Sequence, residues 1–329
     1  MEFLETLDIV VIAMFLAISL GIGVIYRKSA SKNLESFFLG GRNLPWYIAG
    51  VSMVATTFAA DTPLTITEIV GANGISGNWL WWNLLLGGML TTFFFSKLWR
   101  RAEVMTELEL IQIRYGGKSA QYLRYFKSIY LGLFINAVII AWVNIALMSI
   151  LEVFFGISKD MQLLIVSAIM LFTFIYSSMS GLLGVAISDF FQFVVAMTGC
   201  IILAVIVINS DEIGGIQGLK DKLPAETFNF LPALGSSKSD LFVITWPLFF
   251  AYTCFLWWSS WYPGAEPGGG GYIVQRILST KNEKHAILST LFFQIAHYAL
   301  RPWPWILVGL AAMVLYPELN ADSKRLGYI

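Results

Sequence analysis

The feature that most constrains this chain is an apolar stretch that is long enough to cross a membrane but is interrupted in its middle. It runs from Leu44 to Ala72 and reads LPWYIAGVSMVATTFAADTPLTITEIVGA. Pro63 cannot donate a helical hydrogen bond, and it disfavours helical geometry at Thr62. Asp61 is ionisable and falls near mid-bilayer depth, which is costly unless its carboxylate faces a cavity, a cation or a partner. The stretch therefore predicts a broken helix.

Two interpretations of this break are open. The first is a proline-kinked helix packed against its neighbours. The second is a cation and substrate site, because many secondary transporters build such sites from the freed backbone carbonyls of broken helices. Small hydroxyl residues accompany the carboxylate, namely Ser52, Thr56, Thr57, Thr62 and Thr65. The buried acid makes the first interpretation energetically unfavourable, so the sequence favours a site.

The composition predicts an integral membrane protein. Charged residues make up 13% of the chain and hydrophobic residues 57%, whereas a soluble domain usually carries about 25% charged residues. The net charge is zero, so nothing indicates a nucleic-acid partner. Two cysteines in apolar stretches and two histidines offer no zinc-site spacing, and no serine–histidine constellation indicates catalysis. We therefore predict that the protein is not an enzyme.

Eight apolar segments have about the 20 residues that a helix needs to cross a bilayer. They are 5–26, 44–72, 77–98, 125–156, 161–180, 185–209, 241–262 and 286–316. Most lysines and arginines fall on one side if the first span starts outside, which makes that side the inner one. The expected location is the cell membrane, as a multi-pass protein with segment 210–240 as an outward loop containing a short amphipathic helix.

Further polar residues have alternative interpretations. Asp189 either caps the start of the span at 185–209 or attracts cations. Arg301 falls near mid-depth of the last span, where it pairs with a buried acid or lies in a water-filled vestibule. His297, one turn earlier, shares that face either as a core group or as a substrate contact. The glycine run 268–271 is a hinge or a loop.

Four segments taken together resemble the sodium:solute symporter family, which includes sodium-coupled sugar, proline, pantothenate and sialic-acid carriers. They are FFLGGRNLPWY (Phe37–Tyr47), GVSMVATTFAADT (Gly50–Thr62), SGLLGVAISDFFQ (Ser180–Gln192) and YIVQR (Tyr272–Arg276). Each segment alone is weak, but their order and spacing agree with the family over nearly the whole chain.

The resemblance implies an all-α integral membrane protein with a leucine-transporter-type fold, in which two inverted five-helix repeats follow one extra helix. Residues 1–43 would hold the extra helix and an inward loop, 44–209 the first repeat, 210–240 the outward loop, and 241–329 the start of the second repeat. On this basis the fold is truncated, with about eight transmembrane helices. We expect an N-terminal part of a longer carrier that cannot carry out coupled transport by itself.

The resemblance also implies site residues. Sodium would be bound by the backbone carbonyls of Ala55 and Phe58 and by Asp61, which matches an acidic position of proline-type carriers, and Asp189 is a further candidate. Candidate substrate contacts are Thr56, Thr57, Thr62, Asn83, Trp258, His297 and Arg301. The inner aromatic gate would comprise Trp257, Trp261 and Tyr262, beside Trp258.

The predicted function is sodium-coupled symport of a small polar organic solute by alternating access, with Na+ as the coupling ion. Thr57 and Thr62 stand where sugar carriers place substrate-binding amides, which argues against a sugar. His297 and Arg301 favour an organic anion or an amino acid. The alternative is a symporter-like sensor module of a signalling protein. The expected partners are the solute and the lipid bilayer, while the oligomeric state is left open.

Overall fold

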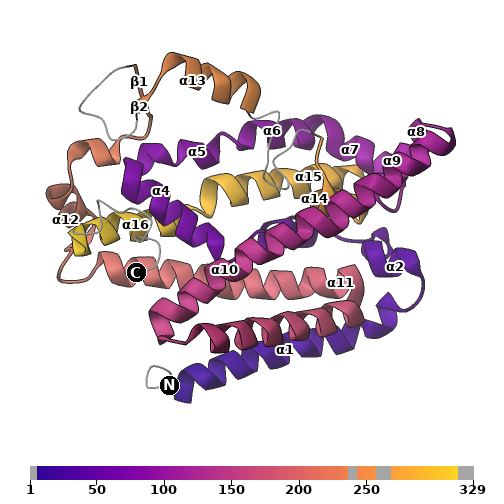
Figure 1. The fold of residues 1–329 in the computed structure, drawn as a ribbon, viewed down its shortest axis with the longest axis horizontal. Helices are drawn as coiled ribbons and strands as arrows, with labels where there is room; N and C mark the ends of the chain where they lie inside the picture. The colour runs from indigo at the N-terminus through magenta and orange to yellow at the C-terminus, as the bar shows by residue number, and fades with distance from the viewer. Residues whose placement is uncertain (1–5, 236–242, 257–267, 318–329) are drawn as a thin grey trace. The chain divides into compact units, whose positions relative to one another are not determined.

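The computed structural model describes residues 6–235, 243–256 and 268–317, and this part of the chain is mostly helical (Figure 1). The chain folds into two compact units that alternate along the sequence. The first unit is Met1–Ala60, Thr92–Gln192 and Gly270–Phe292, and the second is Asp61–Thr91, Phe193–Gly269 and Phe293–Ile329. Neighbours within each unit therefore come from distant parts of the sequence.

The named elements of the first unit are helices and helical turns in the residues described. Its elements are α1 (Thr6–Ala30), α2 (Leu34–Leu39), the 3₁₀ turn η1 (Gly40–Arg42), α3 (Trp46–Thr56), α7 (Ser96–Ala102), α8 (Glu107–Arg114), α9 (Gly117–Ile129), the π-helical turn η3 (Tyr130–Ile135), α10 (Asn136–Phe155) and α14 (Gly271–Leu278). Elements that cross the boundary between the units are η2 (Thr91–Phe95), α11 (Lys159–Ile208) and α15 (Glu283–Gln294).

The second unit combines short helices with one small pair of strands. Its elements are α4 (Asp61–Gly77), α5 (Trp79–Trp82), α6 (Leu85–Leu90), α12 (Gly215–Lys222), η4 (Ala225–Phe228), β1 (Ala233–Leu234), β2 (Val243–Ile244), α13 (Trp246–Ala251), η5 (Tyr252–Leu256), η6 (Ile295–Leu300) and α16 (Trp303–Leu315). The strands β1 and β2 pair in parallel. Helix α12 is the short helix expected in the outward loop.

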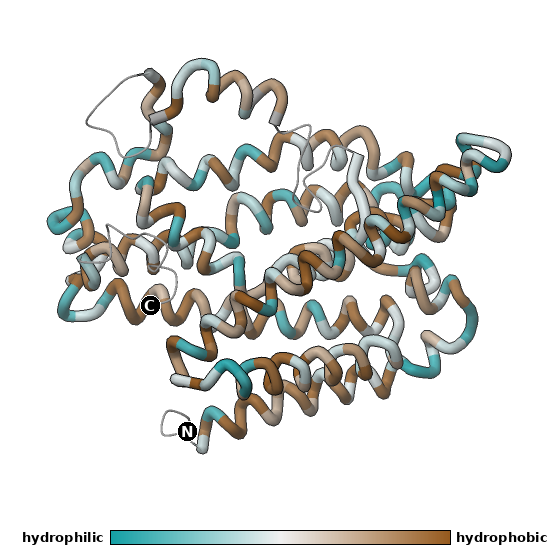
Figure 2. Tube along the Cα trace, in the orientation of Figure 1, coloured by the Kyte–Doolittle hydropathy of each residue, from teal (hydrophilic) through white to brown (hydrophobic). Residues whose placement is uncertain are grey.

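Among the described residues, four helical stretches are long and apolar enough to cross a membrane: Thr6–Ala30, Gly117–Phe155, Lys159–Ile208 and Glu283–Leu315. Figure 2 shows the hydrophobic residues that run along α1 and α11. Helix α11 covers two of the predicted spans, which meet at a break where Gly181 has φ +57° and ψ −169°. The count of eight spans stays a prediction.

The predicted spans 44–72 and 77–98 are not continuous helices. The first is divided into α3 and α4, as the sequence predicts, and the second is interrupted at residues 83–84 between α5 and α6, after which α6, η2 and α7 follow one another without a gap. Asn83 contributes to the second division, because its Nδ2 donates to the carbonyls of Trp79 and Leu80 at 2.8 and 2.9 Å. An amide side chain that binds nearby backbone competes with regular helical pairing.

The core of the first unit surrounds α14, which packs on α2, α3 and α7. Val274 and Leu278 from α14 lie in a buried cluster with Leu39 and Val104. Leu44 and Thr280 form an isolated parallel bridge beside this cluster. In the second unit, α16 packs on α4 at Gly309, where an added Cβ would lie 3.2 Å from the Cα of Thr67.

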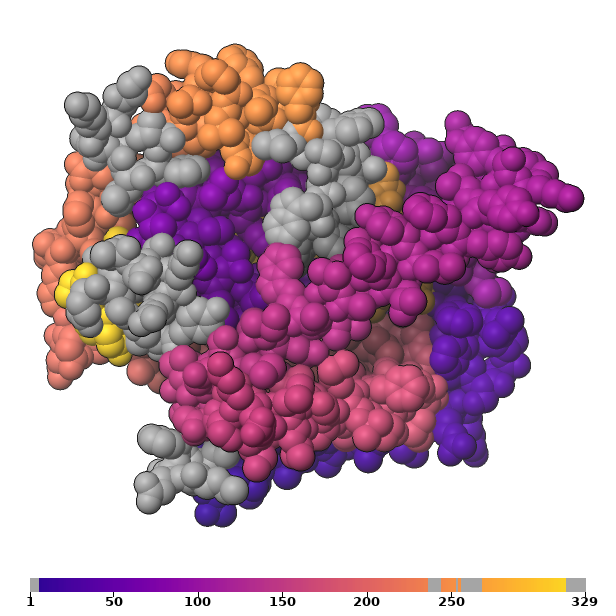
Figure 3. Space-filling model, viewed as in Figure 1, coloured from indigo at the N-terminus to yellow at the C-terminus, as the bar shows by residue number. Residues whose placement is uncertain are grey.

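The turn η3 and helix α10 expose large apolar side chains, and Figure 3 shows this part of the chain, in magenta, at the surface. Leu133 is 69% exposed and Phe134 61% exposed. Burying such side chains in lipid removes the unfavourable contact with water, so this surface fits a hydrocarbon environment.

Candidate functional site

The predicted break in the helix is present. Helix α3 ends at Thr56, residues 57–60 are not helical, and α4 begins at Asp61. Pro63 falls in the first turn of α4, where its missing N–H has no helical partner to lose. The carbonyl of Ala55 accepts a hydrogen bond from the Phe58 N–H at 2.8 Å. The Thr57 N–H also points to the carbonyls of Val54 and Ala55.

Asp61 lies at the start of α4 in the second unit. Its Oδ1 is buried and accepts no hydrogen bond from the described part of the chain. The N-terminal end of a helix favours a negative charge. The position therefore leaves one oxygen of Asp61 open to a cation.

Asp189 lies in a different environment, within the first unit. Its Oδ2 accepts a hydrogen bond from Ser52 Oγ at 2.5 Å and lies 3.6 Å from Arg276 Nη2. Arg276 Nε also donates to Ser52 Oγ at 3.1 Å, and its Nη2 donates to Thr56 Oγ1 at 3.0 Å. Arg276 is only 5% exposed. These four side chains, called here the Asp189 network, join α3, α11 and α14.

The Asp189 network unites three of the motif segments singled out in the sequence. Gly50–Thr62 supplies Ser52 and Thr56, Ser180–Gln192 supplies Asp189, and Tyr272–Arg276 supplies Arg276. Arg276 is not among the site residues that the sequence predicts. Its position at the end of the YIVQR motif was the available clue.

The capping interpretation of Asp189 is wrong. Helix α11 resumes directly after the break at Gly181, so Asp189 lies about two turns inside it rather than at its start. Gly181 is required at the break, because an added Cβ would lie 2.8 Å from the Phe37 carbonyl oxygen.

His297 and Arg301 are enclosed by aromatic rings in the second unit. The ring centroid of His297 lies 5.0 Å from that of Phe293 and 5.2 Å from that of Trp81. The guanidinium of Arg301 lies 5.3 Å from the ring centroid of Trp305. His297 is 0% and Arg301 1% exposed, and His297 lies in the π-helical turn η6. Both interpretations of Arg301, pairing with a buried acid and lying in a water-filled vestibule, stay predictions.

The three threonines predicted to contact substrate lie at the break and differ in the hydrogen bonds described for them. Thr56 donates to the Ser52 carbonyl at 2.8 Å in addition to its contact with Arg276. Thr57 is buried and donates to the Val54 carbonyl at 2.8 Å. Thr62 is also buried and belongs to the second unit. Thr56 is therefore part of the Asp189 network.

Asn83 is 8% exposed, and its amide nitrogen is bonded to its own helix. These hydrogen bonds satisfy the amide nitrogen of Asn83 within the protein, without a contact to substrate. The predicted gate residues and one substrate candidate lie outside the described residues: Trp257, Trp258, Trp261 and Tyr262.

Comparisons with known proteins all find similarity to sodium-coupled carriers. The model of the sodium:solute symporter family matches residues 37–318. Sodium/glucose cotransporter 1 from Mus musculus is 26% identical over 336 residues, which cover 94% of this chain and 47% of that protein. A sodium/glucose cotransporter from Vibrio parahaemolyticus is 25% identical over 328 residues, covering 97% and 58%. The chain spans about half the length of the curated relatives it matches.

A solved structure of a Na+-coupled sialic acid symporter, in a substrate-bound outward-open state, has a similar fold. The TM-score is 0.73 at 22% identity, and the match covers 96% of this chain and 62% of that one. At this identity the likeness shows the fold alone, which is that of a helical membrane symporter.

Proposed function

The chain belongs to the sodium:solute symporter family, as its motifs predict, and from this premise we propose that the full-length protein carries out sodium-coupled symport of a small polar organic solute. Transport would proceed across the cell membrane by alternating access, within a multi-pass leucine-transporter-type fold of inverted repeats. The observation that carries the proposal is the open Oδ1 of Asp61 at the break between α3 and α4. A buried carboxylate oxygen without a donor is stabilised when a cation binds it.

Sodium would be held at the break by the carbonyls of Ala55 and Phe58 together with Asp61. These residues fall within one short stretch of the chain, where the helical pairing of the backbone is interrupted. Backbone carbonyls and carboxylates are oxygen ligands of the kind that discontinuous helices offer to sodium.

Asp189 would be a second place for sodium during its passage. In the structure its charge is matched by Arg276, at 3.6 Å, which is longer than a hydrogen-bonded ion pair. Sodium and the Arg276 guanidinium would therefore compete for the same carboxylate. Sodium would leave the Asp189 carboxylate when the Arg276 guanidinium binds it again.

The solute would be an amino acid or an organic anion. The buried charge of Arg301, beside Trp305, supports this class, because a buried cation is stabilised by an anionic ligand. His297 adds a polar group one turn away, and Thr57 and Thr62 lie at the break. The named relatives are sodium/glucose cotransporters and a sialic acid symporter, so uptake measurements must distinguish sugars from amino acids and organic anions.

The test is uptake of radiolabelled solutes into proteoliposomes that contain the full-length protein. The panel holds proline, glutamate, sialic acid, pantothenate and glucose, each with an inward sodium gradient and with potassium replacing sodium. We expect sodium-dependent uptake of one acidic or zwitterionic solute. Uptake of glucose alone would contradict the solute class, while binding of a solute without any uptake would contradict transport itself.

A further inference from the structure

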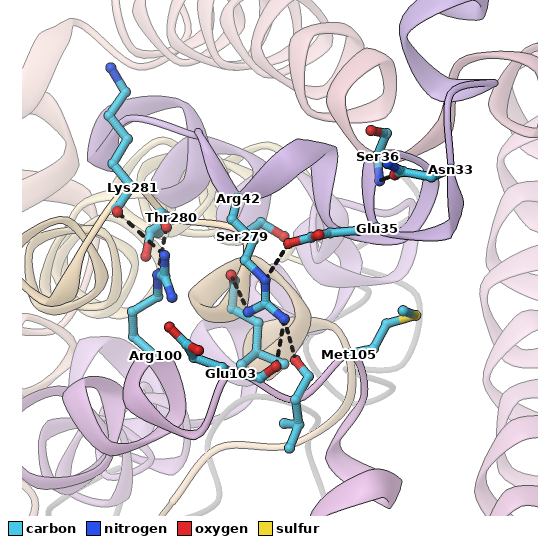
Figure 4. Close-up of polar contacts among 12 residues, drawn as sticks. Asn33, Glu35, Ser36, Arg42, Arg100, Glu103, Met105, Ser279, Thr280 and Lys281 are labelled. Carbon is cyan, nitrogen blue, oxygen red and sulfur yellow. Dashed lines mark hydrogen bonds and ion pairs between the residues drawn. The ribbon is translucent and has the colours of Figure 1, made fainter.

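The corner between α14 and α15 is held by side chains from two other segments. Four consecutive backbone carbonyls, from Leu278 to Lys281, all accept hydrogen bonds from outside the corner. Arg42 Nη1 reaches Leu278 at 3.5 Å, Leu44 N reaches Ser279 at 3.0 Å, Arg100 Nε reaches Thr280 at 2.8 Å, and Arg100 Nη2 reaches Lys281 at 3.4 Å. Figure 4 shows the two arginines converging on this corner.

Arg42 joins three segments of the first unit through one guanidinium group. Besides the corner, it contacts Glu35 at 2.7 Å and donates to the carbonyls of Glu103 and Val104 at 2.7 and 3.0 Å (Figure 4). Arg42 and Glu103 both have φ +51°, a left-handed conformation that is unfavourable outside glycine. The surrounding contacts must therefore stabilise this strained geometry.

Helix α14 is short and is also fixed at its beginning. The Gly271 N–H donates to Glu107 Oε2 at 2.7 Å, and Gln275 Nε2 donates to the Phe38 carbonyl at 3.1 Å. Its eight residues span about 12 Å, so a shift at either end moves every side chain on it. Arg276 lies in the last turn, immediately before the corner that Arg42 and Arg100 hold.

We propose that Arg42 and Arg100 are positioning residues for the Asp189 network. By fixing the end of α14, they place the Arg276 guanidinium where it competes with sodium for Asp189. This inference rests on the proposed function. At the corner these donors bind backbone carbonyls rather than acids, so their role there is to fix the position of the chain. Arg101, which follows directly, instead forms an exposed ion pair with Glu283 at 2.6 Å and supplies a matched control.

The experiment compares Arg100→Gln, Arg42→Gln and Arg101→Gln in full-length protein in proteoliposomes, using the solute that wild type transports. The sodium concentration for half-maximal uptake should fall about threefold in the first two variants, the effect of losing one modest hydrogen bond. It should fall because a displaced Arg276 competes less with sodium. Arg101→Gln should match wild type, since exposed pairs contribute little.

Combining Arg100→Gln with a substitution of Asp189 distinguishes a positioning role of Arg100 from a general effect on protein stability. In an Asp189→Asn background, Arg100→Gln should leave the sodium dependence unchanged, because the competing carboxylate is gone. If Arg100→Gln does not yield folded protein, Arg100→Lys keeps the charge with fewer donors and should give a smaller shift in the same direction. Sodium dependence equal to that of Arg101→Gln in every folded variant would overturn the proposal. Absence of sodium-dependent uptake by wild type would instead overturn the proposed function.

Discussion

Asp61 and Asp189 are two carboxylates in segments predicted to cross the membrane, and their surroundings differ. Asp189 has a serine hydroxyl at 2.5 Å and an arginine at 3.6 Å. Asp61 has an oxygen that accepts no hydrogen bond from the described residues, at the start of a helix. The first carboxylate is already matched by a positive charge of the protein, whereas the second has room for a positive charge from outside.

The difference teaches how one chain can use the same residue type in two ways. Removing one partner of a buried ion pair leaves an uncompensated charge, which costs about 3–5 kcal/mol. Leaving a single oxygen unsatisfied costs about 1–3 kcal/mol, which a bound cation offsets. Asp189 is thus tied to the stability of its unit, and Asp61 to the binding of an ion.

The largest effect on stability is expected for Arg276→Ala, which removes the positively charged partner of Asp189. The free energy of unfolding should fall by about 3–5 kcal/mol, measured by denaturant unfolding in detergent micelles. The double variant Asp189→Asn with Arg276→Gln replaces the charges by amides and should recover at least half of that loss. If Arg276→Ala unfolds like wild type, Asp189 does not depend on the arginine, and the contrast with Asp61 fails.

A smaller effect is expected for Ser52→Ala, which removes the short hydrogen bond to Asp189. Hydrogen bonds to charged groups contribute about 1.5–3 kcal/mol, so stability should fall within that range. Thr56→Val is the matched control, because Thr56 contacts Arg276 but has no hydrogen bond to Asp189 among those described. Equal losses of unfolding free energy in the two variants would show that the hydrogen bond to Asp189 contributes no more to stability than the contacts of Thr56.

The smallest change in free energy is expected for Asp61→Asn, and it should appear in sodium binding. The sodium concentration for half-maximal uptake should rise about tenfold, equivalent to about 1.4 kcal/mol, while the unfolding free energy stays near that of wild type. Asp160→Asn makes the same substitution at an exposed carboxylate and should change neither quantity. Unchanged sodium affinity in Asp61→Asn would remove Asp61 from the proposed site.

The local features of this fold were predictable from the sequence, and the long-range ones were not. Pro63 and Asp61 within an apolar stretch predicted the break, because both act on the backbone around them. The contact between Ser52, Asp189 and Arg276 joins three segments far apart in sequence, and helical periodicity gives no information about such pairing. The division of segment 77–98 was missed because Asn83 binds its own backbone, which an apolar pattern does not reveal.

The length of the helix that continues from α9 through η3 into α10 has a consequence for the bilayer. The stretch Gly117–Phe155 has 39 residues and is about 58 Å long, nearly twice the hydrocarbon thickness of about 30 Å. Helix α10 alone, with 20 residues, matches that thickness. With α10 matched to the hydrocarbon core, the π-helical turn η3 would lie at the edge of the lipid tails, and the exposed Tyr122 and Tyr125 of α9 would fall at the level of the headgroups. A thicker or thinner bilayer would move this level along the helix. Such a change in thickness would therefore alter the surroundings of the ion pair between Lys127 and Glu107.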